Sequence, residues 1–324
     1  MFDKLIESLK ANPKKIVFPE GVDPRILEAA ARLKALGDCL TPILIGSPAD
    51  VRAAAQANGF DIDGLEIIDP AAYPGMDAMV EKMVELRKGK MTADECRAAL
   101  SKSNYFGTML VKLGYADALL GGATYSTADT VRPALQLIKT KPGNKIVSSC
   151  FILVRSTENG DERIAMGDCA INISPSEDEL VEIAIETAKC AKIFGIDPKV
   201  AFLSYSTKGS GKGDSVDLVR NACIKAQAAA PDIAIDGELQ FDAAVSPVVA
   251  ATKCKGSPVA GQANTFIFPD IDAGNIGYKI AQRLGGFEAY GPILLGLNAP
   301  INDLSRGCNA EEVYKMALIT AALA

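Results

Sequence analysis

Short apolar runs alternate along this chain with longer stretches in which apolar residues recur at helical spacing, and this alternation limits the fold more than any other feature. Ile16–Glu20 has the composition of a buried strand. Asp23 and Pro24 then predict the start of a helix that ends before Gly37, since Asp caps helix N-termini and Pro fits the first helical position. Strands separated by helices form parallel sheets with helices on both faces. We therefore expect an α/β protein.

The length of 324 residues predicts two domains, because a single hydrophobic core stops growing near roughly 250–300 residues. The polar segment 139–144, which contains Pro-Gly, is the best boundary. Residues 148–174 then form two β-rich runs around Asn159-Gly160, a strong hairpin signal, and such an arm suits contacts between subunits. Alternation resumes as far as 292–298. We expect two three-layer α/β domains with mainly parallel sheets around a cleft, and ligands at the carboxyl ends of the strands.

The charge balance and the missing residue types narrow the chemistry. The net charge of −6 argues against nucleic-acid binding, which needs a basic face to neutralise phosphates. The chain has no His, so it can build no Ser-His or Cys-His pair and no imidazole metal ligand. Acid–base work must therefore fall to Asp, Glu, Lys, Tyr or Cys.

The eight cysteines have no metal-binding or disulfide pattern. The nearest two, Cys150 and Cys169, are nineteen positions apart, which fits no zinc motif. The first ten residues are amphipathic without a long apolar core, and no apolar run is long enough to span a membrane. We expect a cytoplasmic protein with reduced thiols and without an export signal or a membrane span.

A glycine-rich segment, 208–214, falls between an expected strand and an expected helix. Gly209 and Gly211 leave backbone N–H groups accessible at a helix N-terminus, and Lys208 adds positive charge, a combination that suits phosphate. The spacing fits neither a P-loop nor a dinucleotide fingerprint. The competing interpretation is a mobile surface loop that leads into a capped helix.

Asp236, Glu238 and Gln240 alternate at the end of another expected strand, so they share one face if the strand continues. Carboxylates in such a cluster can hold Mg²⁺. We favour a role in lining the cleft, because no second acidic cluster completes a metal site.

The segment 302–309 places a hydroxyl, a guanidinium and a thiol next to the last expected helix, in Ser305, Arg306 and Cys308. These groups at a helix N-terminus suit an anion and acyl site. A structural interpretation competes, in which Asn309 is the N-cap and Glu312 only completes a capping box. Cys308 could be a nucleophile activated by the helix dipole, but most cysteines are inert core residues.

Several segments in order give this chain a specific resemblance. It resembles the phosphate acetyltransferase (phosphotransacetylase) family over essentially its whole length. The segments are FPEG (18–21), ADALLGGATYSTADTVRPALQLIKT (116–140), SYSTKGSG (204–211), DGELQFDAAV (236–245), NTFIFPD (264–270) and PINDLSRGC (300–308).

The resemblance implies an activity and a fold. The family converts acetyl phosphate and coenzyme A reversibly to acetyl-CoA and phosphate, as a homodimer. It implies a fold like that of the isocitrate and isopropylmalate dehydrogenases, with a first domain of residues 1–143 plus 302–324 and a second of 144–301. It implies no metal and no cofactor, with coenzyme A as a substrate.

The resemblance also implies which residues of this sequence correspond to the functional residues of the family. The catalytic Ser-Arg pair of the family falls on Ser305 and Arg306, and the aspartate proposed as its general base falls on Glu312, which differs from the expected residue. The family's arginines that contact coenzyme A fall on Arg87 and Arg132. The residues expected to bind substrate or coenzyme A also include Ser126 and Thr127, together with Lys208, Gly209 and Gly211 of the glycine-rich segment.

Other functions remain open at this point. A phosphate butyryltransferase would differ only in the size of its acyl pocket, and one or two methylenes are worth only about 1–3 kcal/mol. A metal-dependent decarboxylating dehydrogenase would need a nicotinamide and a divalent ion. A non-catalytic coenzyme-binding homologue would bind coenzyme A without turnover, and Glu312 is the feature that favours it.

Overall fold

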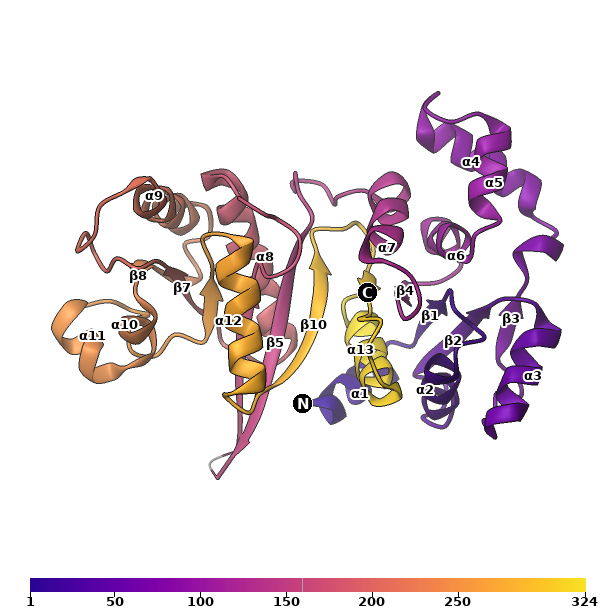
Figure 1. The fold of residues 1–324 in the computed structure, drawn as a ribbon, viewed down its shortest axis with the longest axis horizontal. Helices are drawn as coiled ribbons and strands as arrows, with labels where there is room; N and C mark the ends of the chain where they lie inside the picture. Colours follow the sequence, from indigo (N-terminus) through magenta and orange to yellow (C-terminus); the bar gives the residue numbers. More distant parts are fainter. Residues whose placement is uncertain (159) are drawn as a thin grey trace. The chain divides into compact units, whose positions relative to one another are not determined.

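The computed structural model describes residues 1–158 and 160–324, and these divide into two compact units (Figure 1). The first unit comprises Met1–Pro142 with Leu297–Ala324, and the second comprises Gly143–Gly296. The chain returns to the first unit at Leu297 rather than at residue 302. The reason is local pairing, because Leu297 forms a β-bridge with Thr140 and the Asn298 N–H donates to the Lys139 carbonyl.

The first unit is built on a parallel sheet of five strands in the order β11-β4-β1-β2-β3. The strands are β1 (Lys14–Phe18), β2 (Leu40–Ile45), β3 (Glu66–Ile68), β4 (Ala118–Gly121) and β11 (Ile301–Asp303). The sequence did not predict β11 as a strand. Its three residues become a strand because they pair with β4, a contact that no local pattern encodes.

Helices cover both faces of this first sheet. They are α1 (Phe2–Ala11), α2 (Pro24–Lys34), α3 (Pro48–Asn58), α4 (Met76–Arg87), α5 (Ala93–Leu100), α6 (Ser103–Lys112), α7 (Thr127–Pro133) and α13 (Ala310–Ala322), with the short turns η1 (Pro70–Ala72) and η2 (Ala134–Ile138). The C-terminal helix α13 packs against α1 and α2 (Figure 1). The opposite face packs against α4, α5, α6 and η2 through a core that includes Val17, Ile43 and Phe106.

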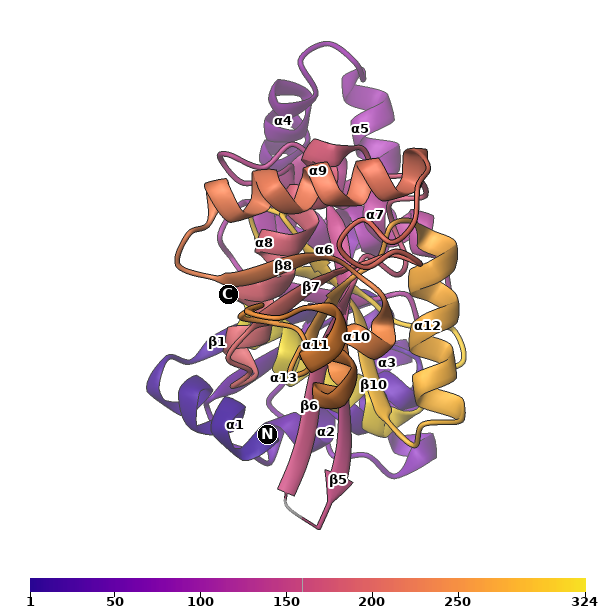
Figure 2. The same ribbon diagram turned by 90° about the vertical axis from the view of Figure 1, so that its left-hand side faces the viewer.

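The second unit contains a mixed sheet of six strands in the order β10-β5-β6-β9-β7-β8. The strands are β5 (Ser148–Thr157), β6 (Gly160–Gly167), β7 (Lys199–Leu203), β8 (Ala234–Leu239), β9 (Thr265–Ile267) and β10 (Glu288–Leu295). The predicted hairpin is present in β5 and β6, which pair antiparallel and extend past the helices of their own unit (Figure 2). Asn159, on which the hairpin signal rested, lies outside the described residues.

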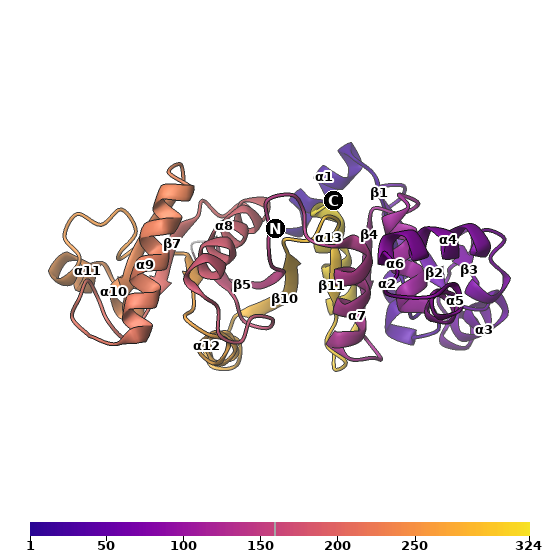
Figure 3. The same ribbon diagram turned by 90° about the horizontal axis from the view of Figure 1, so that it is seen from above.

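Helices also cover both faces of the second sheet. They are α8 (Glu177–Ile193), α9 (Asp214–Ala229), α10 (Phe241–Val245), α11 (Pro247–Lys253) and α12 (Ile271–Arg283). Alternate residues of β7 serve the two faces: Val200 and Phe202 pack with α8 and α9, whereas Ala201 and Leu203 face the core beneath α10 and α11. Figure 3 shows α8 beside α9 and α12 on the other face.

The sequence prediction of an α/β protein with two mainly parallel sheets is confirmed. Capping boxes begin α5 at Thr92 and α8 at Ser176, each with a reciprocal pair of hydrogen bonds to the glutamate three residues later. In the part of the chain that the structure describes, no helix combines the length and the apolar character needed to cross a membrane.

Candidate active site

The strand order of the first sheet reverses at β1, whose neighbours are β2 on one side and β4 on the other. In open α/β sheets, ligands bind outside the carboxyl ends of the strands at such a reversal. The loops that follow β1, β4 and β11 leave the sheet at this edge, because the three strands are parallel neighbours. The loop after β11 carries Ser305 and Arg306, and the loop after β4 leads to Ser126 and Thr127.

The buried carboxylate of Glu20 holds the loop after β4. Glu20 lies directly beyond β1 and is only 7% exposed. Its oxygens accept hydrogen bonds from the N–H groups of Gly122 (2.8 Å), Ala123 (3.0 Å) and Thr124, and from the Thr124 hydroxyl (2.6 Å). Hydrogen bonds to a charged acceptor are among the strongest in proteins. The loop conformation is therefore fixed from beneath by one carboxylate.

A second buried carboxylate, Asp303 at the end of β11, holds the start of α7. It accepts hydrogen bonds from the hydroxyls of Thr127 and Thr130, both at 2.6 Å. Burial raises the pKa of Asp303, and the two hydroxyl donors only partly oppose this effect. A side chain at Gly122 would collide with the Asp303 carboxylate, so glycine is required there. Thr127 thus has a structural partner within the first unit.

A guanidinium, that of Arg25 in the first turn of α2, links the loops after β1, β4 and β11. It forms a two-pronged ion pair with Asp23 and donates to the carbonyls of Ala123, Arg306 and Cys308 at 2.8, 2.8 and 3.1 Å. Burial tends to raise the pKa of Asp23, but the hydrogen bonds from Arg25 outweigh it and the pKa is lowered. These contacts bring the three loops together at one edge.

Ser305 and Arg306 lie exposed on the tight turn between β11 and α13. The Gly307 N–H donates to the Ser305 hydroxyl oxygen at 3.2 Å, and the Cys308 N–H donates to the Ser305 carbonyl at 2.9 Å. Within the described residues, the Arg306 guanidinium has no acidic partner. An exposed, uncompensated cation beside a helix N-terminus favours binding of an anion.

Cys308 is buried under this turn. Burial raises the pKa of its thiol to about 11, although the nearby Arg25 charge lowers it somewhat. A thiol with that pKa is protonated near neutral pH and is a poor nucleophile. The geometry therefore favours the inert-core interpretation of Cys308.

Glu312 forms the capping box that the structural interpretation requires. Its carboxylate accepts from the Asn309 N–H at 3.0 Å, and the Asn309 side chain accepts from the Glu312 N–H at 2.9 Å. The side chain is also exposed, so a carboxylate oxygen stays accessible to solvent. Capping and proton transfer are compatible, since a carboxylate has two oxygens and several lone pairs.

The positive charges of Arg87 and Arg132 both act on the phenol of Tyr105. Burial raises the pKa of the Tyr105 phenol, and the positive charges of Arg132 and Arg87 both lower it. Arg132 is exposed, whereas the Arg87 Nε is buried and has no hydrogen-bond partner in the described chain. Ser126 begins α7 and bonds to Asp129 at 2.7 Å, within a capping box.

In the second unit, the glycine-rich loop is held by the strand beneath it. The Gly209 N–H donates to the Glu238 carboxylate at 2.7 Å, and the Gly211 N–H donates to the Ser206 hydroxyl at 2.9 Å. The Lys208 ammonium bonds to Asp236 and to the Gly237 carbonyl. Both glycine N–H groups are thus engaged, so a phosphate at this loop would contact other atoms of it.

The three polar residues of and beyond β8 therefore have structural partners. Asp236 and Glu238 anchor the glycine-rich loop, and the Gln240 side-chain oxygen accepts from the Lys253 ammonium at 2.9 Å. Across residues 1–158 and 160–324, no three His, Cys, Asp or Glu side chains are grouped so that they could hold a metal ion.

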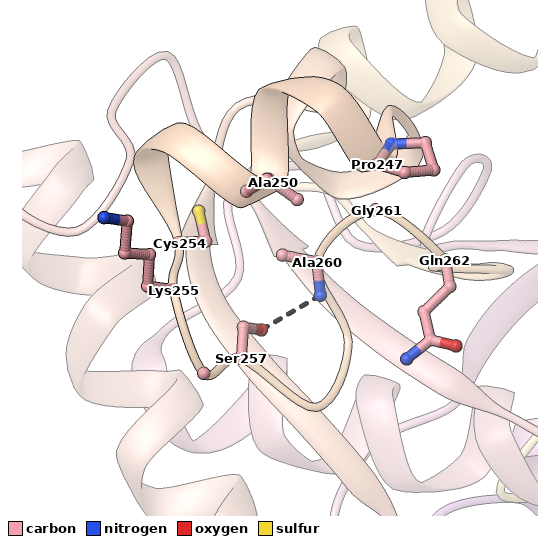
Figure 4. A pocket seen from close by; sticks show the side chains of 10 residues that line it. Pro247, Ala250, Cys254, Lys255, Ser257, Ala260, Gly261 and Gln262 are labelled. Carbon is pink, nitrogen blue, oxygen red and sulfur yellow. Dashed lines mark hydrogen bonds between the residues drawn. The ribbon is translucent and has the colours of Figure 1, made fainter.

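An open hollow of about 380 Å³ lies elsewhere in the second unit, between α11 and the segment that precedes β9 (Figure 4). Ala250, Cys254 and Ala260 line it with small apolar surface, and the Ser257 hydroxyl accepts from the Ala260 N–H at 2.9 Å. None of the residues predicted from the sequence for substrate binding or catalysis lines this hollow.

Comparison with known proteins identifies the family. A model of the family described as phosphate acetyl/butaryl transferase matches residues 1–321. The chain belongs to this family. It is 54% identical over 324 residues to a phosphate acetyltransferase of Bacillus subtilis (strain 168), covering 100% of this chain and 99% of the relative. The resemblance seen in the sequence is thereby confirmed.

Solved structures agree with the family assignment. A phosphotransacetylase from Streptococcus pyogenes is 56% identical, with a TM-score of 0.95, over 99% of this chain and 97% of that one. A Salmonella typhimurium chain named as a 4-hydroxythreonine-4-phosphate dehydrogenase is 14% identical, with a TM-score of 0.56, over 97% and 100% of the two chains. The second likeness concerns the fold alone.

Sequence reasoning missed the groups that hold this transferase-family site together, namely Glu20, Arg25 and Asp303. Glu20 and Asp303 lie within segments that carried the resemblance, but nothing local assigned them a partner. Arg25 had a detectable signal. A cation in the first turn of a helix opposes the helix dipole, and such a local conflict marks a residue retained for another reason.

The capping geometry generates a prediction for Glu312. In Glu312→Gln, the amide oxygen still accepts from the Asn309 N–H, so the free energy of unfolding should stay within about 0.5 kcal/mol of wild type. In Glu312→Ala the hydrogen bond from the Asn309 N–H is lost, whereas the Asn309 side chain still accepts from the backbone N–H of residue 312, and the free energy should fall by about 1 kcal/mol. Urea unfolding followed by circular dichroism measures both. Equal destabilisation by the two changes would contradict the capping role.

Proposed function

We propose that the chain catalyses the reversible transfer of an acetyl group between acetyl phosphate and coenzyme A. The family match over residues 1–321 supports the reaction class. One structural observation supports the place of the reaction: Ser305 and Arg306 are adjacent, exposed residues of the turn at the strand reversal of the first sheet, and the Arg306 guanidinium has no acidic partner in the described chain. This arrangement suits a phosphate group with an adjacent carbonyl.

The proposed mechanism is direct attack of the coenzyme A thiol in a ternary complex. The thiol sulfur forms a bond to the acetyl carbonyl carbon, the carbon–oxygen bond to phosphate breaks, and phosphate leaves. Arg306 binds the phosphate and stabilises its charge, and Ser305 donates a hydrogen bond to the oxyanion that develops on the carbonyl. No imidazole is needed, in keeping with a chain without His.

Glu312 is our proposal for the base that accepts the thiol proton. A thiol of pKa near 8.5 is mostly protonated at neutral pH, so a positioned base adds roughly 10²–10⁴ in rate. The other carboxylates at this edge of the sheet, Glu20 and Asp303, are buried and already accept hydrogen bonds from protein donors.

The Glu312→Gln variant should keep the fold of the wild-type protein and lose about a hundredfold in kcat, because it lacks the base. Activity near wild type would place the base elsewhere.

Coenzyme A binding is proposed for Arg87 and Arg132, supported by the effect of both charges on the Tyr105 phenol and by the unpartnered buried Nε of Arg87. Guanidinium groups bind phosphates with two parallel hydrogen bonds. We keep Ser126 and Thr127 as predicted contacts, although both hydroxyls have intramolecular partners. Lys208 also stays a predicted contact, because its ammonium has three donors and two are engaged.

We propose that the protein has a fold like that of the isocitrate and isopropylmalate dehydrogenases, supported by the TM-score of 0.56 to the Salmonella chain. A cytoplasmic location is supported by eight cysteines that are all free and buried.

We propose that catalysis needs neither a metal nor a cofactor, since the mechanism uses only side chains and the two substrates.

A homodimer is proposed, with α12 as the contact surface. Ile276, Ile280 and Leu284 follow one another at four-residue spacing on and just beyond this helix and are 58%, 54% and 84% exposed. Gly274 and Gly277 face the unit's own core, so the apolar stripe points outward. A helical stripe of this kind can pair with its own copy about a twofold axis.

The first experiment measures thioester formation from coenzyme A with acetyl phosphate and butyryl phosphate separately, in the presence of a chelator. We expect rapid turnover with acetyl phosphate and slower turnover with butyryl phosphate. Preference for butyryl phosphate would retain the mechanism and change the substrate. Coenzyme binding without turnover of either substrate would favour the non-catalytic homologue.

The division of labour among the arginines predicts different kinetic defects. Arg306→Ala should lower kcat by about a hundredfold or more, because its contact strengthens as phosphate leaves. Arg87→Ala should chiefly raise the KM for coenzyme A. Steady-state kinetics with each substrate varied in turn measures both effects. Equal losses in kcat and KM for the two variants would contradict this division.

The proposed dimer surface predicts that Ile280→Asp produces a monomer, because a charge would be buried in the apolar contact. Ile224→Asp is the matched control, since Ile224 is 58% exposed on α9 of the same unit. Light scattering coupled to size-exclusion chromatography measures the mass of each variant. A dimeric Ile280→Asp would exclude α12 as the contact, and a monomeric wild type would exclude the dimer.

A further inference from the structure

Arg25 uses every donor it has on groups at the edge of the first sheet. The Nε hydrogen and one Nη2 hydrogen donate to the two oxygens of the Asp23 carboxylate, with nitrogen–oxygen distances of 3.0 and 2.8 Å. The second Nη2 hydrogen serves the Ala123 carbonyl at 2.8 Å, and the two Nη1 hydrogens serve the carbonyls of Arg306 and Cys308 at 2.8 and 3.1 Å. A guanidinium has five N–H donors, and all five are accounted for.

The turn that Arg25 holds is the one that carries Ser305 and Arg306. It begins where β11 ends at Asp303 and finishes where α13 begins at Ala310. Leu304 is fixed by its N–H bond to the Gly121 carbonyl at 2.7 Å, but beyond it the backbone runs exposed through Gly307. The two carbonyls that Arg25 binds flank Gly307 on either side. Arg25 thus fixes the peptide plane that leads into Gly307, the most flexible residue of the turn, and the peptide plane that follows Cys308.

We infer that Arg25 is the positioning residue of this active site: it touches no substrate itself, and it sets the direction in which Ser305 and Arg306 point. This inference rests on the proposed role of Ser305 and Arg306. Small errors of position in a catalytic group can cost about a hundredfold in rate. A residue that controls the turn backbone therefore controls kcat.

The chemistry of Arg25 fits positioning better than general stabilisation. A cation in the first turn of α2 is repelled by the positive end of the helix dipole, so Arg25 lowers the local stability of this helix. The planar fork matches carbonyls on two loops at once, whereas a lysine has only three donors without fixed geometry. Asp23 is the orienting partner, because its carboxylate takes both Nε and Nη2.

Arg32 offers a matched control on the same helix. It also links α2 to the C-terminal segment, through an ion pair of 2.6 Å with Glu311 and a contact of 4.2 Å between its guanidinium and the Tyr314 ring. Its partners, however, are the side chains of Glu311, in the first turn of α13, and of Tyr314, and not the backbone of the 305–308 turn. The Arg32→Gln variant loses only this link between α2 and α13, and Arg25 still binds the 305–308 turn.

The test compares kcat in Arg25→Lys, Arg25→Ala and Arg32→Gln, each first checked by circular dichroism for a folded state. We expect Arg25→Lys to lose about tenfold or more in kcat with the KM for coenzyme A within about threefold of wild type. Arg32→Gln should retain the wild-type kcat. Free guanidinium ion at millimolar concentration should restore part of the kcat of Arg25→Ala, because it can occupy the vacated fork.

A double-mutant cycle with Arg306→Ala separates positioning from stability. If Arg25 acts through the turn, Arg25→Lys should cost less than about twofold in kcat once Arg306 is absent. Additive losses, or a folded Arg25→Lys with wild-type kcat, would overturn the inference. Failure of the proposed site has a different signature, since Arg306→Ala would then leave kcat unchanged. If both Arg25 variants fail to fold, Asp23→Asn serves as the milder variant and should give the same non-additive loss.

Discussion

Buried charge at one edge of the first sheet holds the candidate active site together. Glu20 binds the backbone of the loop after β4, and Arg25 joins that loop to the turn after β11. Asp303 adds a third link through the start of α7. Charged groups are costly to remove from water unless their hydrogen bonds are complete. Because each of these groups is hydrogen-bonded within the protein, together they favour one loop conformation.

This internal pairing also explains why the exposed charge of Arg306 is available. Carboxylates around the turn have other partners. Glu20 and Asp303 accept from loop donors, Asp23 pairs with Arg25, Glu311 pairs with Arg32, and Glu312 accepts from the Asn309 N–H. An arginine beside free carboxylates would form an ion pair and lose its affinity for an anion. In the described structure, Arg306 keeps its charge for a ligand, and α13 adds the partial positive charge of its N-terminus.

The sequence predicted the secondary structure well where local chemistry is strong. Asp23 caps the helix that it was expected to cap, and the hairpin pairs as expected through its described residues. It failed at β11, which is only three residues long and has no pattern of its own. The expected phosphate-binding N–H groups of Gly209 and Gly211 proved to be engaged, since Glu238 and Ser206 reach them from positions that the loop sequence does not encode.

The sequence by itself determined the fold class and the family, because these follow from periodicity and from motifs contiguous along the chain, and it predicted Ser305, Arg306 and Glu312 as site residues. Only the tertiary structure decided that Arg25 reaches the turn that carries two of them, and that Glu312 caps α13. The physical reason is the distance along the chain. Arg25 and Arg306 become neighbours only because β1, β4 and β11 end side by side, and strand pairing of that kind is decided by the whole sheet.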